Sequence, residues 1–237
     1  MSMTEPKPRV AVVTFPGSND DHDAALALAR LGAEAVPVWH ADRELPDVRA
    51  VVLPGGFSYG DYLRAGALAR FAPVMEPLRA LAADGGLVLG ICNGFQVLCE
   101  AGLLPGALRP NHSLSFVCRD VPLTIERTDT PFTARCSKGQ RLSIPIKHGE
   151  GCFFAGPELL SELEASGQIV LRYEGESPNG SVARIAGLVN AEGNVMGLMP
   201  HPEHAVDALT GSTDGALLLG SLVDAARRIA AAEPTAV

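Results

Sequence analysis

The chain alternates short apolar runs with stretches of helical character, and this alternation limits its fold more than any other feature of the sequence. Four runs rich in Val and Leu end at turn residues: Val10–Phe15, Val36–Trp39, Ala50–Leu53 and Leu87–Leu89. Runs this short and apolar are typical of strands buried on both faces. Helical patterns occur at residues 24–30, 63–83 and 93–101. Strands that alternate with helices predict a mostly parallel sheet with helices on both faces.

The pattern changes between residues 115 and 189. Apolar segments here are separated by turns rather than by long helices, among them Leu123–Ile125, Leu142–Ile146 and Ile169–Leu171. Such segments indicate antiparallel or mixed strands. The chain then returns to a strand at Asn194–Met199 and ends in an Ala- and Leu-rich helix at residues 214–231. We therefore expect an α/β fold, with a mostly parallel central sheet, helices on both faces and a smaller antiparallel or mixed sheet region.

Composition excludes several classes of protein. Of the 237 residues, 47% are hydrophobic and no linker divides them, so we expect one domain over residues 8–237 after a flexible N-terminus of residues 1–7. The net charge of -8 leaves no basic stripe for a nucleic acid. Val10–Phe15 is too short for a signal peptide or a membrane span. Five cysteines without CxxC spacing indicate reduced thiols and no metal site, which predicts a cytoplasmic protein.

The segment Gly90–Gly94 has the spacing G-x-C-x-G, directly after a buried strand and directly before a helix. This is the setting of a nucleophile elbow, in which flanking glycines relieve crowding around a strained residue. The N-terminal end of the helix would favour the thiolate of Cys92, and the amide of Asn93 could donate to a developing oxyanion. The alternative is a buried cysteine packed between two glycines. Cys99, Cys118, Cys136 and Cys152 lack this setting, and we interpret them as packing residues.

A thiol nucleophile needs a base, and His201 is the histidine best placed to provide it. It follows the apolar run Val195–Met199 and lies between two prolines. A residue before proline avoids the helical region, so an extended chain would turn His201 and Glu203 to the same side. The alternative is a proline-stiffened strand end with surface side chains. By the same reasoning His204 lies at the wrong parity, and no partner is evident for His22, His40 or His112.

A second glycine loop, Leu53–Tyr62, follows another predicted strand. Its paired glycines expose backbone amides without side-chain cover, so it could supply the other half of an oxyanion hole. It matches neither of the common glycine-rich phosphate motifs. A tight turn needed only for chain reversal is the alternative interpretation.

Together, Pro54–Asp61, Gly90–Gln96 and Pro200–Glu203 resemble the class I (triad) glutamine amidotransferases. The loop Pro54–Asp61 points to a narrower branch, the stand-alone glutaminase subunits of phosphoribosylformylglycinamidine synthase in purine biosynthesis. The likeness runs almost from end to end, and it also covers Phe15–Asn19, Asp61–Gly66, Lys147–Gly151 and Asn179–Ser181. The chain differs from the family pattern at Asp20, where a cysteine is common, and at Cys152, where a polar residue is common. Neither position belongs to the triad.

The resemblance implies a role for each matched residue. Cys92 would be the nucleophile, and His201 and Glu203 would complete the triad. The backbone amides near the second glycine loop and the elbow would form the oxyanion hole, namely those of Gly55, Gly56, Phe57 and Asn93. Gln96 would help to build the glutamine pocket.

The resemblance also implies partners. Ammonia would pass to an ATP-dependent synthetase subunit, with a small third subunit in the complex. ATP and magnesium would bind to that partner, and no cofactor, nucleic acid or membrane is expected for this chain. Three alternatives remain: a glutaminase serving another synthetase, a cysteine hydrolase or peptidase on the same fold, and a non-catalytic module that senses glutamine.

Overall fold

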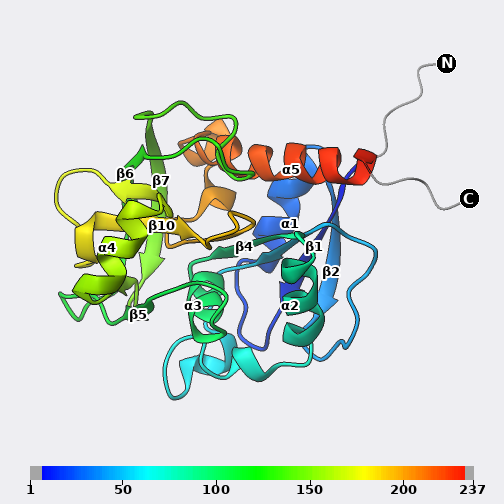
Figure 1. Cartoon of the computed structure of the whole chain (residues 1–237), viewed down its shortest axis with the longest axis horizontal. Coiled ribbons are helices and arrows are strands. Elements are labelled where there is room, and N and C mark those ends of the chain that lie inside the picture. The colour runs from blue at the N-terminus through cyan, green and yellow to red at the C-terminus, as the bar shows by residue number, and fades with distance from the viewer. Residues whose placement is uncertain (1–6, 233–237) are drawn as a thin grey trace, which may run out of the picture.

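A computed structural model describes residues 7–232, and its main feature is a nine-stranded sheet (Figure 1). The strands lie in the order β2-β1-β3-β4-β11-β10-β9-β6-β7. Their bounds are β1 Arg9–Thr14, β2 Glu34–Trp39, β3 Ala50–Leu53, β4 Leu87–Ile91, β6 Val117–Ile125, β7 Arg141–His148, β9 Ile169–Tyr173, β10 Ile185–Val189 and β11 Val195–Leu198. A two-stranded antiparallel sheet pairs β5 (Ala107–Arg109) with β8 (Cys152–Phe154).

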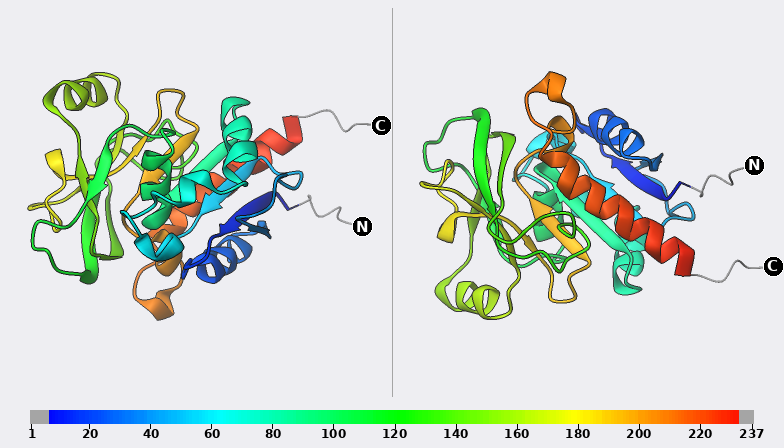
Figure 2. Two further views of the ribbon diagram at one scale, coloured as in Figure 1. Left: turned by 90° about the horizontal axis from the view of Figure 1, so that it is seen from below. Right: turned by 90° about the horizontal axis from the view of Figure 1, so that it is seen from above.

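Helices cover both faces of the parallel half of the sheet. Their bounds are α1 Asp21–Arg30, α2 Met75–Ala83, α3 Asn93–Glu100, α4 Pro157–Ala165 and α5 Gly215–Ala232. The two views of Figure 2 show α1 and α5 on one face of this half, and α2 and α3 on the other. Short 3-10 turns lie at Ser58–Asp61, Ala69–Phe71, Val182–Arg184, Pro202–His204 and Ala208–Thr210.

Parallel pairing brings five strand ends to one edge of the sheet. β1 pairs with β2 and β3, β3 with β4, and β4 with β11, all in parallel. Their carboxyl ends lie at Thr14, Trp39, Leu53, Ile91 and Leu198. In open α/β sheets, ligands bind outside the carboxyl ends of the strands. The predicted glycine loop, the cysteine elbow and the His-Pro-Glu segment each follow one of these ends.

The predicted α/β class is confirmed, but the antiparallel strands are not a separate region. β10, β9, β6 and β7 extend the same sheet beyond β11 by antiparallel pairing. The expectation that turns rather than helices separate these strands missed α4, which lies between β8 and β9. Pro157 begins this helix, and proline is common in the first turn because its missing N–H has no helical partner there.

The helix expected over residues 63–83 was wrong in its first half. Only Met75–Ala83 forms an α-helix, and residues 57–74 form a loop with two short 3-10 turns. Left-handed backbone at Asp61, Leu63 and Gly66 interrupts any continuous helix. Apolar side chains at helical spacing are present in this loop, but local backbone contacts override their pattern.

The predicted single domain over residues 8–237 stays a prediction. The predicted flexible N-terminus falls mainly on residues 1–6, which lie outside the described residues. Within residues 7–232, none of the helices combines the length and the apolar character that crossing a bilayer requires.

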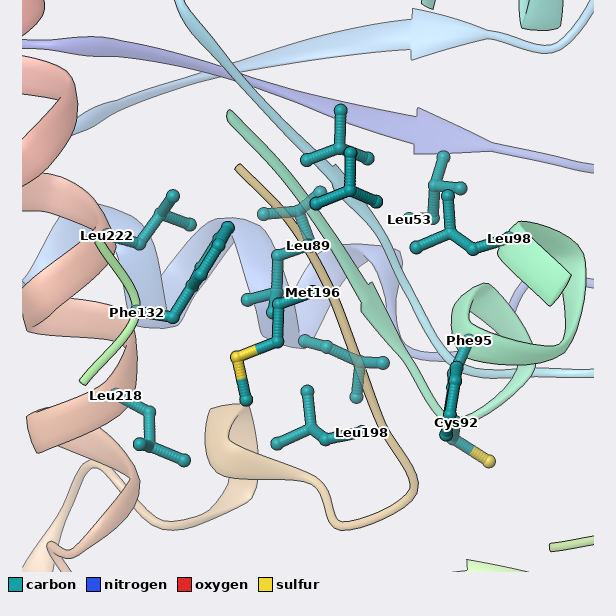
Figure 3. Close-up of a cluster of buried hydrophobic side chains, with 14 of the residues drawn as sticks. Leu53, Leu89, Cys92, Phe95, Leu98, Phe132, Met196, Leu198, Leu218 and Leu222 are labelled. Carbon is teal, nitrogen blue, oxygen red and sulfur yellow. The ribbon is translucent and has the colours of Figure 1, made fainter. Parts of the chain in front are cut away.

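Phe132 connects the long loop between β6 and β7 to the core beneath α5. Its side chain is only 1% exposed. In Figure 3 its ring lies beside Leu222 and Leu218 of α5, with Leu89 and Met196 of the sheet across from it. The same loop donates a hydrogen bond from the Arg135 amide to Ser221 Oγ at 2.9 Å. The loop therefore holds α5 against the sheet.

We expect Phe132→Ala to lower the free energy of unfolding by about 3–5 kcal/mol, because truncating a buried Phe loses apolar burial and leaves a cavity. Urea denaturation followed by circular dichroism measures the change. Phe116→Ala is the matched control, since that ring is 55% exposed, and its effect should stay within about 0.5 kcal/mol. Equal effects of the two substitutions would contradict this role of Phe132.

Candidate active site

Cys92 lies at the sharp turn from β4 into α3, as the G-x-C-x-G spacing predicts. Its backbone has φ 50° and ψ -103°, a conformation that residues with a side chain rarely adopt. A Cβ at Gly90 would approach the Gly94 carbonyl group to 2.6 Å, and one at Gly94 would overlap the Leu53 carbonyl oxygen. Both glycines are therefore required by close backbone approach. Backbone strain of this kind is typical of functional sites.

His201 and Glu203 meet beyond the end of β11. His201 Nδ1 lies 2.6 Å from Glu203 Oε1, and both side chains are buried. The contact agrees with the sequence prediction, but the reason given for it was wrong. Glu203 lies in the 3-10 turn Pro202–His204 rather than in an extended segment. The turn brings the carboxylate back under the imidazole ring.

Cys92 interacts electrostatically with the His201 ring. The buried His201 Nε2, on the other side of the ring from Glu203, has no hydrogen-bond partner among the described residues. Burial alone would lower the pKa of His201, but the Glu203 carboxylate and the Cys92 sulfur outweigh burial and raise this pKa to about 10. The Glu203 carboxylate and the Cys92 sulfur therefore favour the imidazolium form of the ring.

The four residues predicted to provide oxyanion amides differ in their backbone contacts. The Phe57 amide donates to the Gly17 carbonyl at 2.8 Å, so in this conformation it is engaged elsewhere. Gly55 lies against the His201 ring, where an added Cβ would come within 2.7 Å of Cε1. Gly56 has φ +142° and pairs with Ser18 across an isolated bridge. Asn93 begins α3, so its amide belongs to the first turn, where helix amides lack a helical partner.

Gln96, expected to help build the glutamine pocket, is buried with both polar ends of its side chain occupied. Its Nε2 donates to the Glu150 carbonyl at 2.7 Å, and its Oε1 accepts from Asn93 Nδ2 at 2.8 Å. It therefore ties the segment after β7 to the helix that follows Cys92. This position supports the shape of the pocket and leaves little of the Gln96 side chain free for direct contact with a substrate.

Asp61 belongs to the same network. Asn93 Nδ2 lies 3.3 Å from Asp61 Oδ1, and the Ser58 amide donates to Asn93 Oδ1 at 3.0 Å. Burial raises the pKa of Asp61, and the charge of Glu150 adds to this effect, so that the pKa reaches about 6. Two half-buried carboxyl groups thus lie beside the elbow helix.

His148 holds the segment after β7, which the sequence marked only as part of Lys147–Gly151. Its Nδ1 lies 3.1 Å from Asn111 Oδ1. Asn179 Nδ2 donates to the Gly151 carbonyl at 2.7 Å. Burial and the charge of His201 lower the pKa of His148 to about 4, so this ring is neutral. Two further segments that carry the family resemblance, Lys147–Gly151 and Asn179–Ser181, therefore support the site through these contacts.

Sequence reasoning missed Asp20 and undervalued His204. Asp20 is 2% exposed and forms an ion pair with Lys147, while His204 Nε2 lies 3.2 Å from Asp20 Oδ1. His204 had been set aside on parity, an argument that fails because the backbone turns at Pro202. Nothing in the spacing of Asp20 indicated a site. His40, for which no partner was evident, has Nδ1 2.6 Å from Tyr59 Oη.

Metal binding is the other chemistry that this cluster suggests. Asp20, His201, Glu203 and His204 offer ligand atoms within 4.8 Å of one another. The Lys147 ammonium group, however, already contacts Asp20 and would repel a cation there. We therefore interpret the cluster as an ion-pair network.

The other four cysteines lie outside the cluster. Cys136 and Cys152 are buried, Cys99 is half-buried and Cys118 is exposed, and all are free thiols. Burial raises the pKa of Cys136 to about 11, which keeps that sulfur protonated and unreactive.

Comparison with known proteins gives one consistent result. The family model described as a CobB/CobQ-like glutamine amidotransferase domain matches residues 7–215. The chain is 58% identical over 219 residues to the phosphoribosylformylglycinamidine synthase subunit PurQ of Rubrobacter xylanophilus, covering 92% of this chain and 99% of the relative. It is 53% identical over 232 residues to the subunit of the same name from Salinibacter ruber, covering 94% and 99%.

A solved structure agrees with these relatives. A chain in the structure of PurLQS from Thermotoga maritima is 46% identical and superposes with a TM-score of 0.86, covering 92% of this chain and 99% of that one. Together with the strained cysteine turn and the paired histidine and glutamate, these matches show that the chain belongs to the CobB/CobQ-like glutamine amidotransferase family and, within it, groups with the PurQ subunits.

Proposed function

We propose that the chain is the glutaminase subunit of phosphoribosylformylglycinamidine synthase and hydrolyses glutamine at Cys92. The PurQ relatives, matched over nearly their whole length, support the function. One observation supports the residue assignment above all others. A cysteine in a strained strand-to-helix turn interacts with a buried histidine, and that histidine is held by a carboxylate at 2.6 Å. This arrangement fits nucleophilic attack on an amide.

The first half of the reaction forms a thioester. The Cys92 thiolate attacks the side-chain amide carbon of glutamine, a carbon–sulfur bond forms, and the carbonyl electron pair moves to oxygen. Backbone amides near Gly56 and Asn93 stabilise this oxyanion. His201 then donates its Nε2 proton to the departing nitrogen, the carbon–nitrogen bond breaks, and ammonia leaves. Glu203 holds the ring throughout through Nδ1.

The second half releases glutamate. His201, now neutral, takes a proton from water, and the resulting hydroxide attacks the thioester carbon. The carbon–sulfur bond breaks, the thiolate of Cys92 is restored, and glutamate departs. The high pKa of His201 suits it to hold a proton until ammonia needs it.

A synthetase partner receives the ammonia in this proposal. It is an ATP-dependent subunit that converts formylglycinamide ribonucleotide to the amidine, with a small third subunit in the complex. ATP and magnesium are expected in that partner, and the complex is expected in the cytoplasm. The similar chain in PurLQS supports assembly with other subunits. Exposed apolar side chains beside the glycine loop offer a surface for contact, namely Phe57, Tyr62, Leu63 and Phe71.

The carboxylates of Asp61 and Glu150 would bind the α-ammonium group of glutamine. Both lie beside the helix that follows Cys92, and their mutual repulsion leaves a place where a positive charge is favourable. A peptide bond at the same nitrogen would remove this charge. The pair therefore favours free glutamine over a peptide substrate.

We expect Cys92→Ala to reduce glutamine-dependent synthesis in the reconstituted complex by at least about 1,000-fold, because no thioester can form. Synthesis from added ammonia should remain close to that of the unchanged complex. Cys118→Ala is the control, since this exposed cysteine lies outside the site. A glutamine-analogue electrophile should add its mass to Cys92 and to no other cysteine.

Three results would count against this assignment. Loss of both activities would contradict the division of labour between subunits. Cleavage of peptides by the unchanged chain would favour a peptidase. Failure of the electrophile to label Cys92, with glutamine still bound, would favour a non-catalytic sensor.

We expect Asp61→Asn to raise the KM for glutamine about tenfold while kcat changes little, because one charged contact to the ammonium group is lost. In the unchanged protein KM should rise as the pH falls below about 6, where Asp61 takes up a proton. Steady-state kinetics between pH 5 and 8 checks both effects. Asp84→Asn, an exposed substitution of the same type at the end of α2, should leave KM unchanged. A fall in kcat at constant KM would instead assign Asp61 to ordering the loop.

A further inference from the structure

Asp20 occupies a helix N-cap position without acting as a side-chain cap. It precedes α1, where an aspartate usually accepts a hydrogen bond from an amide of the first helical turn. Its carboxylate makes no such bond. Only its backbone carbonyl serves the helix, accepting from the Ala24 amide at 2.9 Å. The carboxylate is instead buried, which is costly for a charge unless it finds partners.

The partners of this carboxylate come from two other parts of the chain. Lys147 of β7 forms an ion pair with Oδ1, and His204 Nε2 lies 3.2 Å from the same oxygen. The second oxygen, Oδ2, lies 3.6 Å from His201 Nδ1. An added Cβ at Gly55 would overlap Oδ2, so the glycine loop leaves room for this carboxylate.

His201 Nδ1 therefore faces two carboxylates. Glu203 Oε1 lies at 2.6 Å and makes the hydrogen bond, while Asp20 Oδ2 lies one ångström further away. His204 links the two acids, because its Nε2 lies 3.2 Å from Asp20 and 3.6 Å from Glu203. Burial raises the pKa of Asp20, but His204, His201 and Lys147 outweigh burial and hold that pKa well below its usual range. Asp20 is thus charged near neutral pH.

We propose that Asp20 is a positioning residue for the glutaminase reaction, a second carboxylate that acts with Glu203 to hold the His201 ring and to stabilise its positive charge. This inference rests on the proposed function, since it concerns the proton that His201 gives to ammonia. Asp20 does not touch the reacting atoms. It acts through His201, and the ammonium group of Lys147 partly compensates its negative charge.

The charged and titratable groups around His201 come from four segments. Glu203 and His204 lie in the turn after β11, Asp20 lies before α1, and Cys92 begins the elbow. Lys147 and His148 come from β7. His148 is neutral, and Lys147 is the ammonium group paired with Asp20 beside His201.

A merely structural role makes a different prediction. If the Asp20–Lys147 pair only fastened the loop before α1 to β7, removing either partner would break the same contact with the same result. If Asp20 acts electrostatically on His201, the two removals have opposite effects. Loss of Asp20 removes a negative charge and lowers the pKa of His201, whereas loss of Lys147 leaves Asp20 uncompensated and raises it.

The test uses the complex reconstituted with its synthetase partner and measures kcat/KM for glutamine against pH. Activity falls on the alkaline side as His201 loses its proton, so this limb follows the pKa of His201. We expect Asp20→Asn to move the limb down by about one pH unit, the size typical for a charge at this range. Lys147→Met should move the alkaline limb to higher pH, so that this variant retains more activity than the unchanged complex at the most alkaline pH measured. Asp21→Asn, which changes the adjacent acid that bonds Thr14 Oγ1 at 2.9 Å, should leave the limb in place.

Ammonia-dependent synthesis shows whether each variant still assembles with the synthetase partner. If Asp20→Asn does not assemble, the upward shift of the alkaline limb expected for Lys147→Met tests the proposal by itself. Limbs that stay in place, or that move in the same direction in both variants, would overturn the role of Asp20. Failure of the proposed function is separate, because the unchanged complex would then release no ammonia from glutamine, or Cys92→Ala would still release it.

Discussion

The hydrogen bond from the Cys92 amide to the Leu198 carbonyl, 2.8 Å long, ties the cysteine turn to the strand that leads to His201. It continues the parallel register in which Ile91 pairs with Leu198. Because side chains alternate between the faces of a sheet, a slip of one residue would turn the neighbouring groups to opposite sides. The relative position of the proposed nucleophile and base is therefore set by backbone pairing between segments more than a hundred residues apart in the sequence.

The antiparallel half of the sheet completes this site rather than merely extending it. The His201 amide donates to the Pro145 carbonyl of β7 at 2.8 Å, and the Cys92 sulfur lies 3.8 Å from the Lys147 carbonyl of the same strand. β7 also supplies the Lys147 ammonium and the neutral ring of His148. A parallel sheet that ended at β11 would leave the thiol and the imidazole open to water. The added strands bury them, and burial strengthens every charge–charge interaction in the cluster.

Much of this arrangement could be predicted from the sequence, because its cause is local. Gly90 is required by a contact within the turn itself and Gly94 by the Leu53 carbonyl of the neighbouring strand. The apolar run before them marks the strand, so Cys92 could be placed at a strand end. The pairing of His201 with Glu203 was also found, but through an argument from extended backbone that the 3-10 turn contradicts. Residues two positions apart in the sequence are close in space in either backbone conformation. The predicted contact is therefore present, although the backbone between His201 and Glu203 is not extended.

The remaining features depend on contacts between distant segments, which spacing cannot show. Asp20 has the sequence position of an ordinary helix cap, and only the approach of Lys147 and His204 gives its carboxylate another use. The sequence predicts that the Phe57 amide is free to donate to an oxyanion, but in the structure it donates to the Gly17 carbonyl. The helix expected from Leu63 failed because left-handed residues hold that segment as a loop against α3.

The differences between prediction and structure at Asp20, at Phe57 and after Leu63 have the same physical origin. Each concerns a loop at the carboxyl edge of the sheet, where the backbone is not bound by strand pairing and its groups find partners across the site. A loop whose amide is engaged by a neighbouring loop can exchange that bond for one to an oxyanion only by moving. The Phe57 amide, a predicted oxyanion donor, would need such a movement to reach an oxyanion, and Cys92 is only 5% exposed. In the proposed complex, contact of a partner subunit with the exposed apolar side chains of this loop would favour the moved conformation, and this would couple ammonia release to the presence of its acceptor.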